Sequence, residues 1–118
     1  MTGKGLTTQI EDRQGIRLIH VSGSLDSMTH DPFRDLLDPM VNQPHSRIVL
    51  DCNNLTYMNS RGITLMARCH RIATQNQSFF GIAALNSRIT KAIELLGMGK
   101  LMKLYPTVEE AMQAAAAL

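Results

Sequence analysis

Tryptophan is absent from the 118 residues, and aromatic side chains make up only 4% of the chain. Proteins that bind single-stranded nucleic acids stack the bases on aromatic rings along a basic groove. The 12 Lys and Arg residues exceed the 10 Asp and Glu residues by only two, and they are scattered along the chain. The composition therefore argues against direct binding of nucleic acid.

Long apolar runs are missing as well. No stretch approaches the roughly 20 apolar residues of a membrane-spanning helix, and the N-terminal segment lacks the apolar core of a signal peptide. The only cysteines, Cys52 and Cys69, fall in a predicted strand and a predicted helix, which indicates buried thiols and no disulfide framework. Apolar residues still reach 44%, enough for one core. We expect a cytoplasmic protein without membrane insertion, with residues 1–118 in a single domain.

Motifs for catalysis and cofactor binding are also absent. Gly97-Met98-Gly99 lacks the spacing of a dinucleotide-binding loop and follows a predicted helix, so it indicates a helix end. Ser60 does not lie in a Gly-x-Ser-x-Gly elbow. The histidines have no partner at metal-ligand spacing, and we interpret them as structural. We therefore predict no enzyme, no cofactor and no metal. The histidines are His20, His30, His45 and His70.

Hydrophobic patterning predicts strands that alternate with helices. The first two strands should form a hairpin that a Ser22-Gly-Ser24 break ends. The third is a short run of apolar residues, typical of a strand buried on both faces, and a polar turn should follow it. The last should lie at a sheet edge. The predicted strands are residues 6–11, 16–21, 47–51, 78–85 and 103–105.

Four helices are predicted between and after these strands. Asp31 before Pro32 predicts an N-cap followed by Pro at the first helical position. Pro39 should kink that helix or end it near Asp38. The whole order predicts an α/β domain with a mixed sheet of four to five strands and about four helices. The other helices should span residues 60–74, begin at Asn86 or Ser87, and follow a capping box of Thr107 and Glu110.

Ser60 lies where the polar turn meets the second helix. Unpaired N–H groups and the helix dipole favour an anion there, including a phosphate added to the hydroxyl. Gly62 has no side chain, which should let a partner approach that hydroxyl. On the residues alone, an ordinary cap by Asn59 or Ser60, with Gly62 as a tolerated defect, explains the segment better.

Three separated segments, read together, resemble the STAS domain, and most of all the bacterial anti-sigma factor antagonists. They are VSGSLD at 21–26, RIVLDCNNLTYMNSRG at 47–62, and IELLGMGKLMKLYPTVEEAMQA at 93–114. The resemblance covers roughly residues 7–115, almost the whole chain. It is specific because it rests on several spaced features.

The resemblance implies a regulatory switch. In that family, the serine of an Asp-Ser-Ser/Thr-Gly tetrad is phosphorylated by a kinase that is also an anti-sigma factor. The unphosphorylated form binds the kinase, phosphate blocks the binding, and a phosphatase can restore it. By position, Ser60 matches the phosphorylated serine. The resemblance places partner contacts at Gly23, Ser24, Leu25, Asp26, Met58, Asn59, Ser60, Arg61 and Gly62.

Two residues depart from the family tetrad. Asn59 replaces the usual Asp, and Arg61 replaces a small hydroxyl residue with a cation that could pair with a phosphate. These changes leave a second interpretation open, a scaffold or accessory subunit of a signalling assembly or lipid transporter that is not phosphorylated. A binder of a small ligand or nucleotide is the third.

Overall fold

The computed structural model describes residues 5–118, in which five strands alternate with four α-helices. The first four residues of the segment that we examined for a signal peptide lie outside this range. The elements are β1 (Leu6–Arg13), β2 (Ile16–Leu25), α1 (His30–Val41), β3 (Arg47–Met58), α2 (Ser60–Gln75), β4 (Phe79–Ala83), α3 (Ser87–Leu95), the short 3₁₀ helix η1 (Gly99–Leu101), β5 (Lys103–Tyr105) and α4 (Val108–Ala116).

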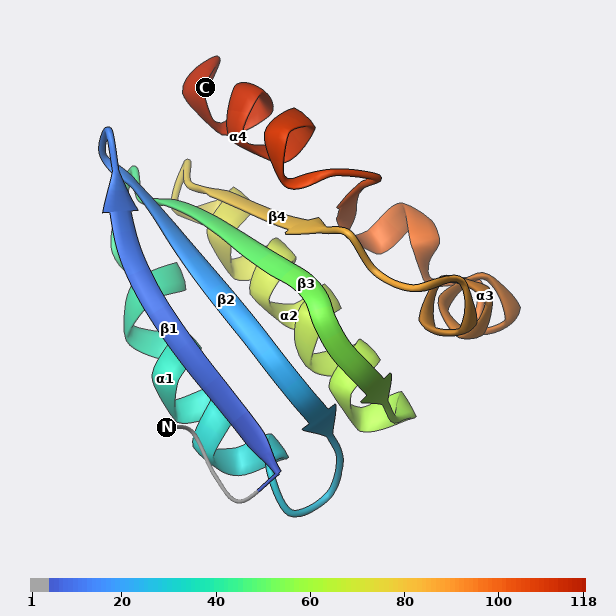
Figure 1. Cartoon of the computed structure of the whole chain (residues 1–118). Coiled ribbons are helices and arrows are strands. Elements are labelled where there is room, and N and C mark those ends of the chain that lie inside the picture. The colour runs from blue at the N-terminus through green and yellow to red at the C-terminus, as the bar shows by residue number, and fades with distance from the viewer. Residues whose placement is uncertain (1–4) are drawn as a thin grey trace.

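The sheet follows the chain order β1-β2-β3-β4-β5. β1 and β2 form the predicted antiparallel hairpin, and each later strand pairs in parallel with the one before it. Helices α1 and α2 cover one face, α4 covers part of the other, and α3 lies at the margin (Figure 1). The predicted mixed α/β architecture, with β5 at an edge, is confirmed.

Apolar side chains pack on both faces of the sheet. The larger cluster, under α1 and α2, contains the fully buried Phe33 and Leu50, and the smaller one under α4 contains Val49. Cys52 and Cys69 belong to the larger cluster as free thiols. Burial raises the pKa of each thiol to about 12, which keeps both protonated and unreactive. The prediction of buried thiols is confirmed.

β2 and β3 are longer than predicted. The break expected after Val21 and the polar turn expected after Asp51 are both wrong, because β2 continues to Leu25 and β3 to Met58. Their parallel register shifts twice, each time with an extra residue on β3. Such bulges let a strand continue where side chains no longer alternate in and out. Gly23 keeps β2 in the sheet with a φ of +104°.

The predicted start and end of α1 need correction. Thr29 is the N-cap residue, so Asp31 and Pro32 are the second and third helical residues. Pro32 is tolerated because first-turn N–H groups have no intrahelical acceptor. Pro39 does not end the helix, which runs on to Val41. Pro39 has no N–H to donate to the carbonyl of Asp35, one turn earlier. Both residues are exposed, so water can bind that carbonyl.

The remaining helix boundaries follow the predictions. Asn59 caps α2. Of the two residues predicted as the start of α3, Asn86 and Ser87, Asn86 is the cap. The Thr107 hydroxyl accepts from the Glu110 N–H at 3.1 Å, which confirms the capping interaction of α4. After α3 the chain turns at Gly97 with a φ of +69°, which confirms the predicted helix end.

Candidate functional site

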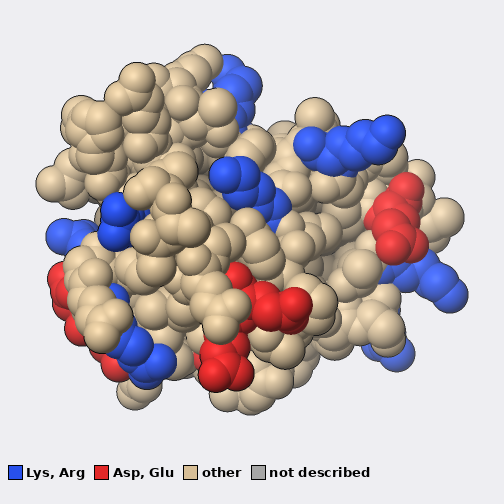
Figure 2. All heavy atoms as spheres, turned by 90° about the horizontal axis from the view of Figure 1, so that it is seen from above, with Lys and Arg blue, Asp and Glu red and all other residues tan. Residues whose placement is uncertain are grey.

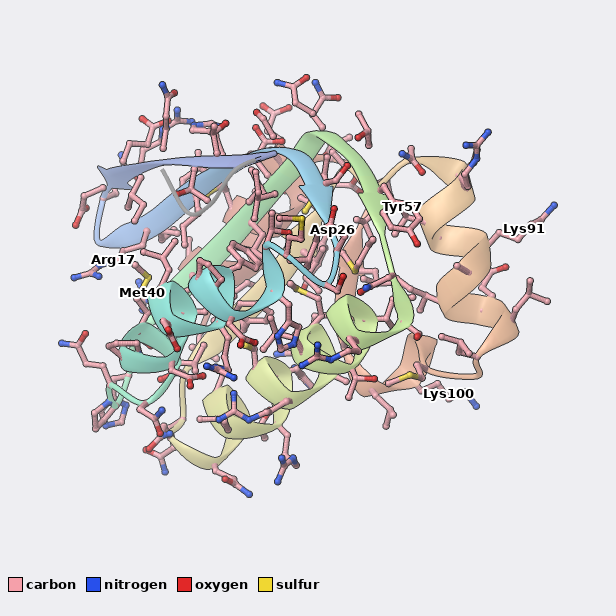
Figure 3. The ribbon with its side chains drawn as sticks, turned by 90° about the horizontal axis from the view of Figure 1, so that it is seen from below. Arg17, Asp26, Met40, Tyr57, Lys91 and Lys100 are labelled. Atoms are coloured by element: carbon pink, nitrogen blue, oxygen red, sulfur yellow. The ribbon has the colours of Figure 1, made fainter. Side chains whose placement is uncertain are left out.

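The adjacent ends of β2 and β3 place Ser60. Leu25 and Met58 are paired at the ends of these parallel strands, and the Asn59 N–H donates to the Leu25 carbonyl at 3.0 Å. The chain then enters α2 directly. Figure 3 shows Asp26 and Tyr57 at these two strand ends. In α/β sheets, the carboxyl ends of parallel strands are where binding sites gather.

Asn59, not Ser60, is the N-cap of α2. Its side-chain oxygen accepts from the Gly62 N–H at 2.9 Å. Ser60 is the first helical residue and is exposed, and its hydroxyl makes no hydrogen bond within residues 5–118. The N–H groups of Ser60 and Arg61 have no intrahelical acceptor. The hydroxyl is therefore free for modification or for a partner.

The structural role of Gly62 differs from the predicted one, which was to let a partner approach the Ser60 hydroxyl. The position of its missing side chain faces inward, where a Cβ would lie 2.7 Å from Met58 Cγ and 2.9 Å from Leu25 Cδ2. The expectation that Gly62 opens the hydroxyl to a partner is therefore wrong. Gly62 instead lets the first turn of α2 pack tightly on the strand ends. Leu25 and Met58 are buried and support the site from beneath.

Gly23 lies in the strand segment beside the site. A Cβ at this position would overlap the carbonyl oxygen of Gly5, and the Ser24 N–H donates to that same oxygen at 2.8 Å. The Thr56 hydroxyl donates to the Gly23 carbonyl at 3.0 Å. Gly5, the residue directly before β1, is thus held against the end of β2.

Asp26 and Thr29 organise the loop between β2 and α1. One carboxylate oxygen of Asp26 accepts from the N–H groups of Met28 and Thr29 at 2.9 and 3.2 Å. The Thr29 hydroxyl donates to the Ser24 carbonyl at 2.8 Å and accepts from the Asp26 N–H at 2.9 Å. Thr29 is only 1% exposed. Sequence reasoning missed it, because a Thr within a polar run carries no signal of burial.

A hollow of about 250 Å³ opens between α1 and α2, with Ser60 on its wall. Three arginines from the two helices share this wall. The α1 residues are about 30 positions earlier in the sequence, so sequence reasoning did not connect them with Ser60. The lining residues are His30, Arg34, Ser60, Arg61, Thr64, Leu65 and Arg68.

Asp31 links the basic groups at the mouth of this hollow. Its carboxylate accepts from His30 Nδ1 at 2.8 Å and from Arg34 Nη1 at 3.4 Å, and Arg61 Nη2 lies 4.0 Å away. These groups, the His30 hydrogen bond above all, lower the pKa of the Asp31 carboxyl. Two turns farther along each helix, Arg68 of α2 pairs with Asp38 of α1 at 2.7 Å. Each arginine thus already has a carboxylate neighbour.

A second titratable cluster lies on the sheet away from Ser60. His20 Nδ1 is 2.7 Å from an Asp51 carboxylate oxygen, and Nε2 is 2.7 Å from one of Glu11. Hydrogen bonding to Glu11 and then to Asp51 raises the pKa of His20. Within residues 5–118, no group of three His, Cys, Asp or Glu side chains has an arrangement that could hold a metal ion.

The surface near Ser60 is partly apolar. Met28 is 76% exposed and Tyr57 is 50% exposed, each beside one of the two strand ends. Elsewhere, charges of both signs are interspersed, as the face in Figure 2 shows. Within the described part of the chain, every helix is too short or too polar to span a bilayer.

Comparison with known proteins identifies the family to which this fold belongs. The STAS domain profile matches residues 7–111. The anti-sigma F factor antagonist of Paenibacillus polymyxa is 25% identical over 101 residues, which cover 85% of this chain and 86% of the relative. The crystal structure of an anti-sigma factor antagonist from Mycobacterium paratuberculosis superimposes with a TM-score of 0.81, at 26% identity and 94% coverage of both chains. The murine anion transporter Slc26a9 shares the fold alone, with a TM-score of 0.75 and 12% identity over 97% of this chain and 22% of its own. The chain belongs to the STAS domain family.

Proposed function

We propose that this protein is a partner-switching regulator that binds an anti-sigma factor with serine-kinase activity and is released when that kinase phosphorylates Ser60. The observation that carries the proposal is the free, exposed Ser60 hydroxyl at the first position of α2. It lies at the position where the family tetrad has its phosphorylated serine. Relatives named as anti-sigma factor antagonists match most of the chain.

The surroundings of Ser60 suit a protein partner. Met28 and Tyr57 offer exposed apolar surface beside the strand ends, and burial of such groups drives association. The loop that carries Met28 is held by Asp26 and Thr29, so this surface is ordered before binding. We assign the partner contacts to the exposed groups around Ser60, with Leu25, Met58 and Gly62 as their buried support.

Phosphate on Ser60 would disrupt such an interface without a large rearrangement. A phosphoserine adds about −1.5 to −2 charges at neutral pH. A charge that is buried without a partner costs several kcal/mol, and each 1.4 kcal/mol changes affinity about tenfold. A phosphatase would restore the binding form. The chain itself acts as a regulator and not as an enzyme in this proposal, in the cytoplasm, where transcription takes place.

Ser87 provides a matched control for the test. Asn86-Ser87-Arg88 repeats the sequence Asn59-Ser60-Arg61, and the Asn86 side chain caps α3 by accepting from the Ile89 N–H at 2.8 Å. Both serines are exposed first residues of a helix. Any general effect of a negative charge at such a position should therefore occur at both.

Affinity capture from a lysate of the source organism, with wild type, Ser60→Asp and Ser87→Asp as baits, tests the switch. We expect wild type and Ser87→Asp to retain an anti-sigma factor that Ser60→Asp loses. Incubation with that partner and ATP should add one phosphate by intact mass, and Ser60→Ala should abolish the gain. Equal capture by all three baits without phosphate transfer would refute the switch and favour the non-phosphorylated scaffold, for which Asn59 in place of Asp is the supporting observation.

A further inference from the structure

We propose that the hollow between α1 and α2 is a receptor for a phosphate carried by Ser60, in which Arg34 and Arg61 bind the phosphate oxygens. Ser60 lies on the wall of this hollow together with three arginines and His30. The inference rests on the proposed function in one respect, that Ser60 is the residue that carries the phosphate. It adds a specific binding site for the modified side chain.

The arginines can exchange their present partners for a phosphate. Arg34 and Arg61 share Asp31 at 3.4 and 4.0 Å, distances that are long for charge-assisted hydrogen bonds. Arg34 also donates to Asp35 from Nε at 3.2 Å and from Nη2 at 3.1 Å. The side chains of Asp31, Asp35 and Arg61 are about three-fifths exposed or more, and ion pairs this exposed contribute little. A phosphate offers three strong acceptor oxygens and more negative charge than one carboxylate. Guanidinium groups bind such an anion in a bidentate manner.

His30 adds an imidazole ring to the wall of the hollow beside the arginines. Its side chain is nine-tenths buried, and Nδ1 faces the Asp31 carboxylate at 2.8 Å. Every buried side-chain nitrogen and oxygen within residues 5–118 has a hydrogen-bond partner, so the other ring nitrogen, which makes no hydrogen bond there, is open to solvent at the hollow.

Ser60 differs from Ser87 in its position on the wall of the hollow, and not in its position at the start of a helix. The segment around Ser87 has the same Asn-Ser-Arg sequence and the same kind of cap, but Ser87 does not line this hollow. A phosphate on either serine would feel a helix dipole and a following Arg. Only the phosphate on Ser60 would also meet Arg34 from α1.

This arrangement gives phosphorylation a second effect. When Arg34 and Arg61 turn to the phosphate, they are withdrawn from any acidic group of a partner. The modification then removes two cations from the surface while it adds its own negative charge. It also ties α2 to α1, so the modified form should be more stable than the unmodified one.

The test uses full-length protein with phosphoserine inserted at position 60 or at position 87 during translation. No kinase takes part, so the outcome does not depend on whether the proposed partner exists. The second pKa of each phosphate is measured by ³¹P NMR titration, against a usual value of about 6. Neighbouring cations lower it, and we expect the value at position 60 to be lower than at position 87 by about 0.5 to 1 unit.

Two arginine substitutions locate the cause. Arg34→Gln should return the pKa at position 60 toward the value at position 87, and it should abolish the rise in melting temperature that phosphate at position 60 brings. Arg71→Gln is the matched control, because Arg71 is an exposed residue of α2 that does not line this hollow. Equal pKa values at positions 60 and 87, or equal effects of the two substitutions, would overturn the proposal. Circular dichroism of each variant verifies the fold.

Discussion

Replacement of Gly62 by Ala tests how tightly α2 is seated on the strand ends. The new Cβ would lie 2.7 Å from Met58 Cγ and 2.9 Å from Leu25 Cδ2, and both side chains are buried with little room to move. Overpacking of this kind costs about 1 to 3 kcal/mol. Ala in place of Gly favours a helix by up to about 1 kcal/mol. We therefore expect Gly62→Ala to lower the free energy of unfolding by roughly 1 kcal/mol, equivalent to about 4 °C in melting temperature.

Urea denaturation followed by far-UV circular dichroism measures this change, since the chain has no Trp to report by fluorescence. Gly99→Ala is the matched control, because a Cβ there would meet nothing within 4 Å. It should be neutral or stabilising by up to about 1 kcal/mol. In a Met58→Ala background, the nearest clashing atom is gone and Gly62→Ala should cost less. Wild-type stability of Gly62→Ala, or an equal cost in both backgrounds, would refute the reasoning.

Three further changes test other contacts. His20→Gln should lower the free energy of unfolding most near pH 5.5. The raised pKa of His20 makes its contribution to stability complete below about pH 6.5 and lost as the pH rises through the folded value, and the lowered pKa of Glu11 keeps that carboxylate ionised down to below about pH 4.5. Urea titrations at pH 5.5 and 8.5 measure the loss, and equal losses at the two pH values would contradict the prediction. Thr29→Val should cost about 1 to 3 kcal/mol by leaving buried polar groups unpaired, and Thr29→Ser should recover most of it in the same denaturation assay. Gly23→Ala should prevent native folding or lower the melting temperature more than Gly62→Ala, because its Cβ would overlap the Gly5 carbonyl and its φ is left-handed; an unchanged melting curve would contradict it.

The sequence predicted the architecture because most elements carry a local signal. The buried strands are short apolar runs, and Asn86, Thr107 and Gly97 mark helix boundaries by chemistry that acts within a few residues. The continuation of β3 to Met58 could not be predicted in this way. Two extra residues on β3 interrupt the alternation of buried and exposed side chains. Asn53 is also a residue type that favours turns, so the segment after Asp51 indicates a turn unless the pairing with β2 is known.

The candidate site was only half predictable for a similar reason. Family resemblance pointed to Ser60, and the structure showed that Asn59 takes the cap and leaves the Ser60 hydroxyl free. The contribution of α1 depends on two helices that pack side by side on one face of the sheet, which no local pattern around Ser60 reveals. Gly62 was misinterpreted because its importance depends on Leu25, more than thirty residues earlier.

The positions of Gly5 and Leu118 in the fold decide how the protein should be immobilised. Gly5 is hydrogen-bonded to the end of β2 that borders the Ser60 surface. The carbonyl of Leu118 accepts from Arg47 at 3.0 Å, at the start of β3 and so at the far end of the sheet (Figure 1). A bead or sensor surface attached after Leu118 would therefore leave the candidate site facing solution, whereas a bulky group joined directly to Gly5, with residues 1–4 removed, would lie beside the site and compete with an arriving partner.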